Sequence, residues 1–376
     1  MIPGKPTMLL FAASLVFPAC TPPKDGKVPD PVTQTDSPSG TDTEDPVDTG
    51  LEPQTETGTD TAADTGVLSP LGLAFAPIDS QHLSFGATWC GFGYDGRHVA
   101  ISVEQGGTIE GALFSLEGQQ LQHQSLLAGP TDTLSGQRIA DHKHVQMDEH
   151  HYIVFSNEGH GSGGELILMK LNQDLERTQI VHIETDDPPT NDMLLVTDGL
   201  TLSVGKFLPG VGHRIYQFDA DLQLLDSVPI GHDEAMHANG AAAVFADGVY
   251  HLVAPMTLQP TVNRQYQHLV FDEHWGLISG PEVVLERDFL GMVTALEYED
   301  ETGFFIAHYN EDTAGVGGNI HRLVFDGEWE LLEDTIVAEG EFARPHTVVV
   351  PGEIWLGYDA NGEVWLHRFS MSVVEQ

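Results

Sequence analysis

The stretch that decides the fold runs from residue 237 to residue 255 and reads His-Ala-Asn-Gly-Ala-Ala-Ala-Val-Phe-Ala-Asp-Gly-Val-Tyr-His-Leu-Val-Ala-Pro. Two apolar segments flank the pair Asp247-Gly248, which is a strong signal for a tight turn. The pattern predicts a β-hairpin. Weaker copies of it recur along the rest of the folded region, which indicates that the hairpin is one unit of a repeat.

Turn signals set the period of this repeat. They recur about every 50 residues, which is the spacing of blades in a β-propeller, where each blade is a four-stranded sheet. A second landmark follows each of the earlier turns and joins two apolar segments, so it predicts the hairpin between the outer two strands of a blade. The turns are Asp95-Gly96, Asp148-Glu149, Asp198-Gly199, Asp247-Gly248, Asp300 to Gly303 and Pro351-Gly352, and the second landmarks begin at Phe114, Leu171, Phe218, Phe271 and Phe325.

We therefore expect an all-β fold, a β-propeller of six blades, with five or seven blades as the alternatives. The last unit supplies three clear strands, at residues 346–350, 353–358 and 363–369. Residues 71–77 are predicted to add its outer strand, because this closes the ring and removes exposed strand edges. Amphipathic helices that would indicate alternating strands and helices are missing from the sequence pattern.

The N-terminal residues predict export. Lys5 precedes an apolar segment, residues 8–17, that is too short to span a bilayer as a helix and fits a signal peptide. This segment ends in Phe17-Pro-Ala-Cys20, and here the chain resembles a bacterial lipoprotein. The resemblance implies that residues 1–20 form a lipoprotein-type signal sequence that ends at Cys20, which becomes the lipidated first residue of the mature protein. Thr21, where the family's inner-membrane retention signal has Asp, favours the outer membrane or cell surface.

Composition separates a linker from the folded domain. Residues 21–66 are rich in Thr, Asp, Pro and Gly and predict a disordered spacer, so that residues 67–376 form the propeller. The whole chain has 57 acidic and 15 basic residues, a net charge of −42, which argues against nucleic acid and anionic lipid surfaces as partners. With 19 histidines, its net charge is expected to change steeply between about pH 5 and 7. Cys90, the second of two cysteines, is expected to be a small buried apolar residue.

Candidate functional residues come from the starts of the innermost strands, because these strands line the central channel of a propeller. Five of the six starts carry a polar side chain that is costly to bury without a partner. The predicted binding ring is His144, Asp192, His237 and His346. The six starts are Trp89-Cys90, residues 142–144, Asn191-Asp192, residues 237–239, residues 292–294 and residues 344–346.

Three interpretations of this ring remain open. The first is a divalent metal site, because imidazole and carboxylate bind zinc, manganese and iron, although ligands from separate blades leave no diagnostic spacing. The second is acid–base catalysis, with Arg344 or Lys143 holding an anionic substrate. The third is a wet channel in which these side chains bond to backbone and water. The metal candidates are His144, His232, His237 and His346, and the catalytic candidates are Asp192, Glu234, His237 and Arg344.

The leading functional hypothesis is a lipid-anchored, extracytoplasmic and monomeric propeller that serves as a binding or scaffold module, with a glycan or an envelope protein as partner. The alternative is a carbohydrate-active hydrolase or lyase with its site at the channel mouth. Asn191-Asp192-Met193 resembles the early strand of five-bladed glycosidases, which carries a catalytic Asp, and Glu234 and Glu297 are available as the acid. A metal-dependent enzyme that uses the channel histidines is the third hypothesis.

Overall fold

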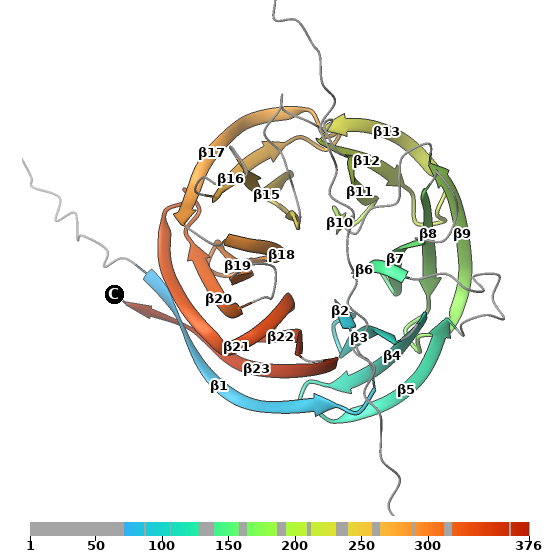
Figure 1. Ribbon diagram of the computed structural model, residues 1–376, viewed down its shortest axis with the longest axis horizontal. Coiled ribbons are helices and arrows are strands. Elements are labelled where there is room, and N and C mark those ends of the chain that lie inside the picture. The colour runs from blue at the N-terminus through green and yellow to red at the C-terminus, as the bar shows by residue number, and fades with distance from the viewer. Residues whose placement is uncertain are drawn as a thin grey trace, which may run out of the picture. The chain divides into compact units, whose positions relative to one another are not determined.

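The fold is that of a β-propeller with six four-stranded blades arranged in a ring, as seen in the computed structural model in Figure 1. This confirms the fold class, the number of blades and the hairpin at Asp247-Gly248, whose strands are β14 and β15. The described part of the chain contains no helix long and apolar enough to cross a membrane. The structure describes residues 71–85, 88–105, 107–127, 139–157, 164–185, 193–208, 212–230, 240–257, 264–287, 290–311, 318–360 and 362–375.

The first three blades follow the chain, from the innermost strand to the outermost, and all neighbouring strands in them are antiparallel. Blade 1 is β2 (Thr88–Tyr94), β3 (His98–Gln105), β4 (Thr108–Ser115) and β5 (Gln120–Leu127). Blade 2 is β6 (Ile139–Met147), β7 (His150–Asn157), β8 (Gly164–Leu171) and β9 (Arg177–Thr185). Blade 3 is β10 (Met193–Thr197), β11 (Leu202–Leu208), β12 (Gly212–Phe218) and β13 (Leu224–Ile230).

The other three blades have the same order, except that blades 5 and 6 share one long strand. That strand, β21 (Leu331–Val350), is outermost in blade 5 and innermost in blade 6, and its pairing register shifts between Ala343 and His346. Blade 4 is β14 (Ala242–Ala246), β15 (Val249–Thr257), β16 (Arg264–Phe271) and β17 (Leu277–Arg287). Blade 5 is β18 (Leu290–Glu299), β19 (Phe304–Glu311), β20 (Gly318–Phe325) and β21, and blade 6 adds β22 (Glu353–Ala360), β23 (Glu363–Glu375) and β1 (Leu71–Leu83).

Strand β1 closes the ring as predicted, by pairing with β23 at the outer edge of blade 6 (Figure 1). It extends six residues beyond the predicted end at Pro77, across a register shift between Pro77 and Asp79. The closing strand thus makes the pairing of blade 6 depend on both ends of the folded domain. With this closure, no blade needs an outer strand from another molecule.

A repeated turn connects the outer two strands in blades 2 to 5, at the positions of the second sequence landmark. In blade 4, for example, the Oδ1 atom of Asp272 accepts hydrogen bonds from the backbone N–H groups of His274, at 2.9 Å, and Gly276, at 2.7 Å. Asn172, Asp219 and Asp326 make the same pair of bonds in the other three blades. The short polar side chain therefore fixes the backbone of each turn locally.

The third residue after this Asn or Asp has a left-handed backbone and a buried side chain, and we call it the wedge residue. Each wedge residue enters the apolar interface between its own blade and the preceding blade. A left-handed non-glycine residue costs roughly 1 to 2 kcal/mol, which burial of a large apolar side chain, worth about 1.5 to 3 kcal/mol, offsets. The wedge residues are Leu175 (φ 58°), Leu222 (φ 56°), Trp275 (φ 60°) and Trp329 (φ 64°).

Candidate functional site

The innermost strands of all six blades enclose a cavity of about 320 Å³ at the centre of the ring. This volume lies at the lower end of the range for small-molecule sites, about 300 to 1,000 Å³. Its wall combines aliphatic side chains with backbone and several polar side chains. The lining residues are 92–94, 143–146, 193–197, 241–245, 294–297 and 346–349.

Two glycines of β2 allow β6 to approach closely on one side of the cavity. A Cβ atom on Gly91 would lie 2.8 Å from Cβ of His144, and one on Gly93 would lie 2.8 Å from Nδ1 of His151. The space left by these glycines holds a pair of imidazoles, because Nε2 of His144 lies 3.2 Å from Nδ1 of His151. Burial lowers the pKa of His151 to about 4 and that of His144 well below its usual range, so both rings are neutral at pH 7.

Two further neutral histidines come from β6 and β21. His142 is fully buried, with its Nε2 atom 3.1 Å from Oγ of Ser102. Burial lowers the pKa of His142 to about 4. The pKa of His346 lies well below its usual range, first because of burial and then because of the positive charges of Lys143, His142 and Arg344. The Nε2 atom of His346 is buried and has no hydrogen-bond partner in the described part of the chain.

The residues around His346 include one further ion pair. Nη1 of Arg344 lies 3.6 Å from Oδ2 of Asp359, a residue of β22 in the same blade. Burial raises the pKa of Asp359 to about 6, and the neighbouring Arg344 opposes this shift. Arg344 has a left-handed backbone, with φ 57°, at the point where β21 passes from blade 5 to blade 6. The positive charge of Arg344 is therefore paired within blade 6.

Glu297 of β18 is the carboxyl side chain among the described lining residues. Its Oε1 atom accepts a hydrogen bond from Oγ1 of Thr347 on the neighbouring blade, at 3.5 Å. Burial raises the pKa of Glu297 to about 8, although the bond from Thr347 acts in the opposite direction. At pH 7 Glu297 therefore carries a proton and can donate it or a hydrogen bond into the cavity.

The predicted site residues divide into two groups. His144 and His346 both line the cavity, and Arg344 lies two residues before His346. Asp192, His232, Glu234 and His237 lie outside the described residues. Among the residues described, no three His, Cys, Asp or Glu side chains come together in a way that could hold a metal ion.

The sequence suggested roles for two further residues of the cavity wall, outside the predicted binding ring. Lys143 was a possible anchor for an anion and Glu297 an available acid, and the structure places both in the cavity wall. Thr347 had no sequence signal, since its partner Glu297 lies 50 residues away. Cys90 is buried and forms no disulfide, which confirms the apolar role expected for it.

No protein-family model matches this sequence, and a search of curated proteins found no match. Solved structures share the fold. The chain is similar to the BP39L lectin from Burkholderia pseudomallei, with a TM-score of 0.52 and 7% identity over 75% of this chain and 96% of that chain. It is also similar to a mutant of AofleA from Arthrobotrys oligospora, with a TM-score of 0.51 and 9% identity over 81% of this chain and 90% of that chain. At such identities the similarity extends to the fold alone.

Proposed function

We propose that this protein is an extracytoplasmic β-propeller that binds a small polar molecule in its central channel. The observation that carries this proposal is the cavity of about 320 Å³ at the meeting point of all six inner strands. Polar groups in and around its wall, among them Nδ1 of His144 and Nε2 of His346, are buried without a hydrogen-bond partner in the described part of the chain. Buried polar atoms in native proteins are usually paired, so such groups point to a bound ligand or water.

We also propose that a lipid on Cys20 anchors the propeller to the cell envelope, at the outer membrane or cell surface. It is supported by the apolar N-terminal segment that ends at Cys20 and by the acidic spacer that follows. The substitution Cys20→Ser tests it. We expect the wild type in the membrane fraction after incorporation of labelled fatty acid and the variant in the soluble fraction, whereas unchanged fractionation would contradict the anchor.

Ligand binding is tested by thermal-shift screening of the full chain against neutral, acidic and amino sugars, amino acids and divalent metals. A ligand present at 100 times its Kd stabilises the folded state by about 2.7 kcal/mol. Val244 lines the cavity and is half-buried, so Val244→Trp fills part of the space. We expect this variant to lose the shift, while the control Val373→Trp on exposed β23 retains it. A shift that survives in Val244→Trp would place binding outside the channel.

Hydrolysis of a glycoside is the second candidate function, and the protonated carboxyl of Glu297 in the cavity favours it. A general acid with a raised pKa is one half of a glycosidase site, and a second carboxylate is the other half. Glu297→Gln keeps the size of the side chain and removes the transferable proton. If the protein is a hydrolase, this variant loses turnover and retains binding, whereas Glu301→Gln in an exposed turn keeps both. Turnover that persists in Glu297→Gln would contradict this assignment.

A further inference from the structure

Lys143 is an unusual residue for the centre of a propeller. It lies on β6, lines the cavity and is 9% exposed. Within the described residues, no hydrogen bond or ion pair reaches its ammonium group, although the protein carries 57 acidic residues. Removal of an ammonium from water is costly unless an anion or several acceptors replace the water. A lysine held in this way is consistent with a partner that is not part of the protein.

The described neighbours of Lys143 do not neutralise its charge. Lys143 and His346 both line the cavity, and positive charge on Lys143 lowers the pKa of His346 and of the neighbouring His142. Arg344 also acts on His346 and is already paired with Asp359. An anion entering this part of the cavity would therefore meet the ammonium of Lys143 beside His346, whose buried Nε2 atom has no hydrogen-bond partner among the described residues. An ionised donor makes the stronger type of hydrogen bond to a carboxylate.

The described wall offers no negative charge that would compensate Lys143 at pH 7. Glu297 is the carboxyl that faces the cavity, and burial keeps it protonated. The remaining polar groups of the wall are neutral, including the amide of Gln146 and the hydroxyl of Thr347. One fixed positive charge combined with several neutral hydrogen-bonding groups suits a ligand with one anionic group and several hydroxyls.

We propose that Lys143 and His346 form a subsite in the channel that binds the carboxylate of a small hydroxylated acid, of the class of uronic acids. This inference rests on the proposed function, because the subsite lies in the same cavity. In it, the ammonium of Lys143 donates to the carboxylate. Gln146 and the protonated Glu297 bond the hydroxyl groups. The volume of about 320 Å³ matches a single monosaccharide unit better than an oligosaccharide.

Calorimetric titration of the full chain with glucuronate and with glucose, at pH 7 and constant ionic strength, tests the subsite. We expect glucuronate to bind at least ten times more tightly than glucose. Lys143→Met should remove this preference by weakening the binding of glucuronate at least tenfold. The matched control is Lys170→Met, since Lys170 pairs with Asp221 at 3.6 Å and does not line the cavity.

The melting temperature distinguishes a lysine that serves a ligand from one that stabilises the fold. Because no residue in the described part of the chain pairs with Lys143, Lys143→Met should have a melting temperature equal to or above that of the wild type. A lower melting temperature would assign a structural role to Lys143 and overturn the subsite. Equal binding of the acid and the neutral sugar, unaffected by Lys143→Met, would overturn the anionic subsite while the channel remains a binding site. If neither sugar binds, this inference is overturned. If the thermal-shift screen finds another ligand whose stabilising effect is lost in Val244→Trp, the proposed function still holds.

Discussion

Two kinds of interface join neighbouring blades in this ring. Between blades 1 and 2, 2 and 3, 3 and 4, and 4 and 5, an apolar wedge residue from the outer turn fills the interface. At each of the two interfaces of blade 6, a buried arginine contacts the neighbouring blade. Arg322 stands over the ring of Phe75, at 3.5 Å, between blades 5 and 6. Arg368 lies between blades 6 and 1 and is 4% exposed.

The difference follows from how the ring closes. Blade 6 has no turn between its outer strands, because β23 and β1 come from opposite ends of the domain. It therefore cannot supply a wedge residue to blade 5. In blade 1 the wedge position is Gly118, with φ 86°, and a Cβ atom there would lie 2.6 Å from Nη1 of Arg368. The guanidinium thus occupies the space that a Leu or Trp side chain fills elsewhere.

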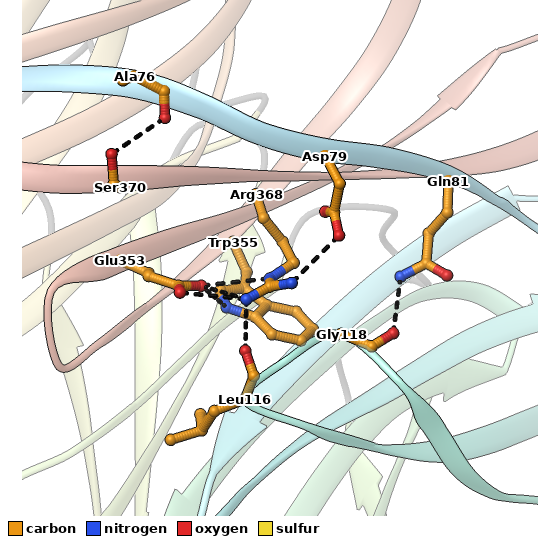
Figure 2. Close-up of polar contacts among 9 residues, drawn as sticks. All are labelled: Ala76, Asp79, Gln81, Leu116, Gly118, Glu353, Trp355, Arg368 and Ser370. Atoms are coloured by element: carbon orange, nitrogen blue, oxygen red, sulfur yellow. Dashed lines mark hydrogen bonds and ion pairs between the residues drawn. The ribbon is translucent and has the colours of Figure 1, made fainter.

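Figure 2 shows how this guanidinium connects three strands and a neighbouring blade. Arg368 donates to Oε2 of Glu353 at 2.8 Å, to Oδ2 of Asp79 at 3.1 Å and to the carbonyl oxygen of Leu116. It also lies 4.8 Å from the ring centre of Trp355. A repeated sequence can build similar apolar interfaces between consecutive blades, whereas closure across the chain ends adds directional polar contacts to an apolar interface.

The largest effect is expected for Arg368→Met. Loss of the guanidinium leaves Glu353 without its main partner and weakens the attachment of β1, which should lower the free energy of unfolding by about 3 to 5 kcal/mol. Denaturant unfolding of the full chain measures this change. Arg97→Met, in an exposed turn, is the control and should change stability by less than about 0.5 kcal/mol. A loss below about 1 kcal/mol for Arg368→Met would show that the closing interface does not depend on this residue.

A wedge residue can be tested in the same way. Trp275→Ala should cost about 3 to 5 kcal/mol by leaving a cavity between blades 3 and 4. Trp275→Leu should cost clearly less, because Leu occupies the same turn position in blades 2 and 3. Part of the remaining cost comes from Oγ of Ser203, which loses the bond from Nε1 of Trp275 at 2.9 Å. Equal losses for the two variants would contradict the interchangeability of wedge residues.

Acid should weaken the interface between blades 4 and 5. There Nδ1 of His251 lies 3.0 Å from Nε2 of His268, and the His268 ring stacks on Trp329 at 3.7 Å. Burial lowers the pKa of His251 to about 4 and of His268 to about 3, below the value near 6.5 of an unfolded chain. Their contribution is complete above pH 6.5 and is lost as the pH falls toward 3.

Unfolding measured at pH 7 and pH 5 checks this expectation. His268→Phe keeps an aromatic ring on Trp329 and removes one titrating group, so its stability should fall by about 1 to 2 kcal/mol less than that of the wild type between these pH values. His274→Phe on the exposed turn is the control. An identical pH dependence in His268→Phe and the wild type would locate the acid sensitivity elsewhere.

The smallest expected effect tests whether Gly118 and Arg368 together take the place of a wedge residue. The double substitution Gly118→Leu with Arg368→Met places an apolar wedge in the interface between blades 6 and 1. We expect it to be about 1 to 2 kcal/mol more stable than the sum of the two single changes predicts, because residues in contact are coupled. A double-mutant cycle by denaturant unfolding measures this coupling. Additive losses would show that Gly118 and Arg368 are not equivalent to a wedge residue.

The sequence allowed the propeller, its six blades and its closing strand to be predicted, because the turn residues act locally and recur. Asp247-Gly248 needs no distant partner to form a turn. The full extent of β1 could not be predicted, since Asp79 breaks the apolar pattern and is held by Arg368, which lies 289 residues away. Likewise, Pro345 suggests the end of a strand but lies inside β21.

For the site, His144 and His346 could be chosen because they begin innermost strands of the predicted blades. The protonated Glu297 could not, because its burial and its bond to Thr347 depend on two blades packing together. The wedge residues also lack a sequence signal, since Leu and Trp rarely occupy a left-handed backbone. The repeat pattern does not determine the contacts between blades, and these contacts set the charge and burial of the site residues.

Hydrogen–deuterium exchange of the full chain, with and without the ligand found by screening, tests the central claim most directly. A molecule bound in the channel should slow exchange in the inner strands of several blades, such as β6, β10 and β18, which line the cavity. Exchange in the outer strands β5, β9 and β13 should remain unchanged. Protection confined to outer strands, or to the rim of a single blade, would contradict binding in the central channel.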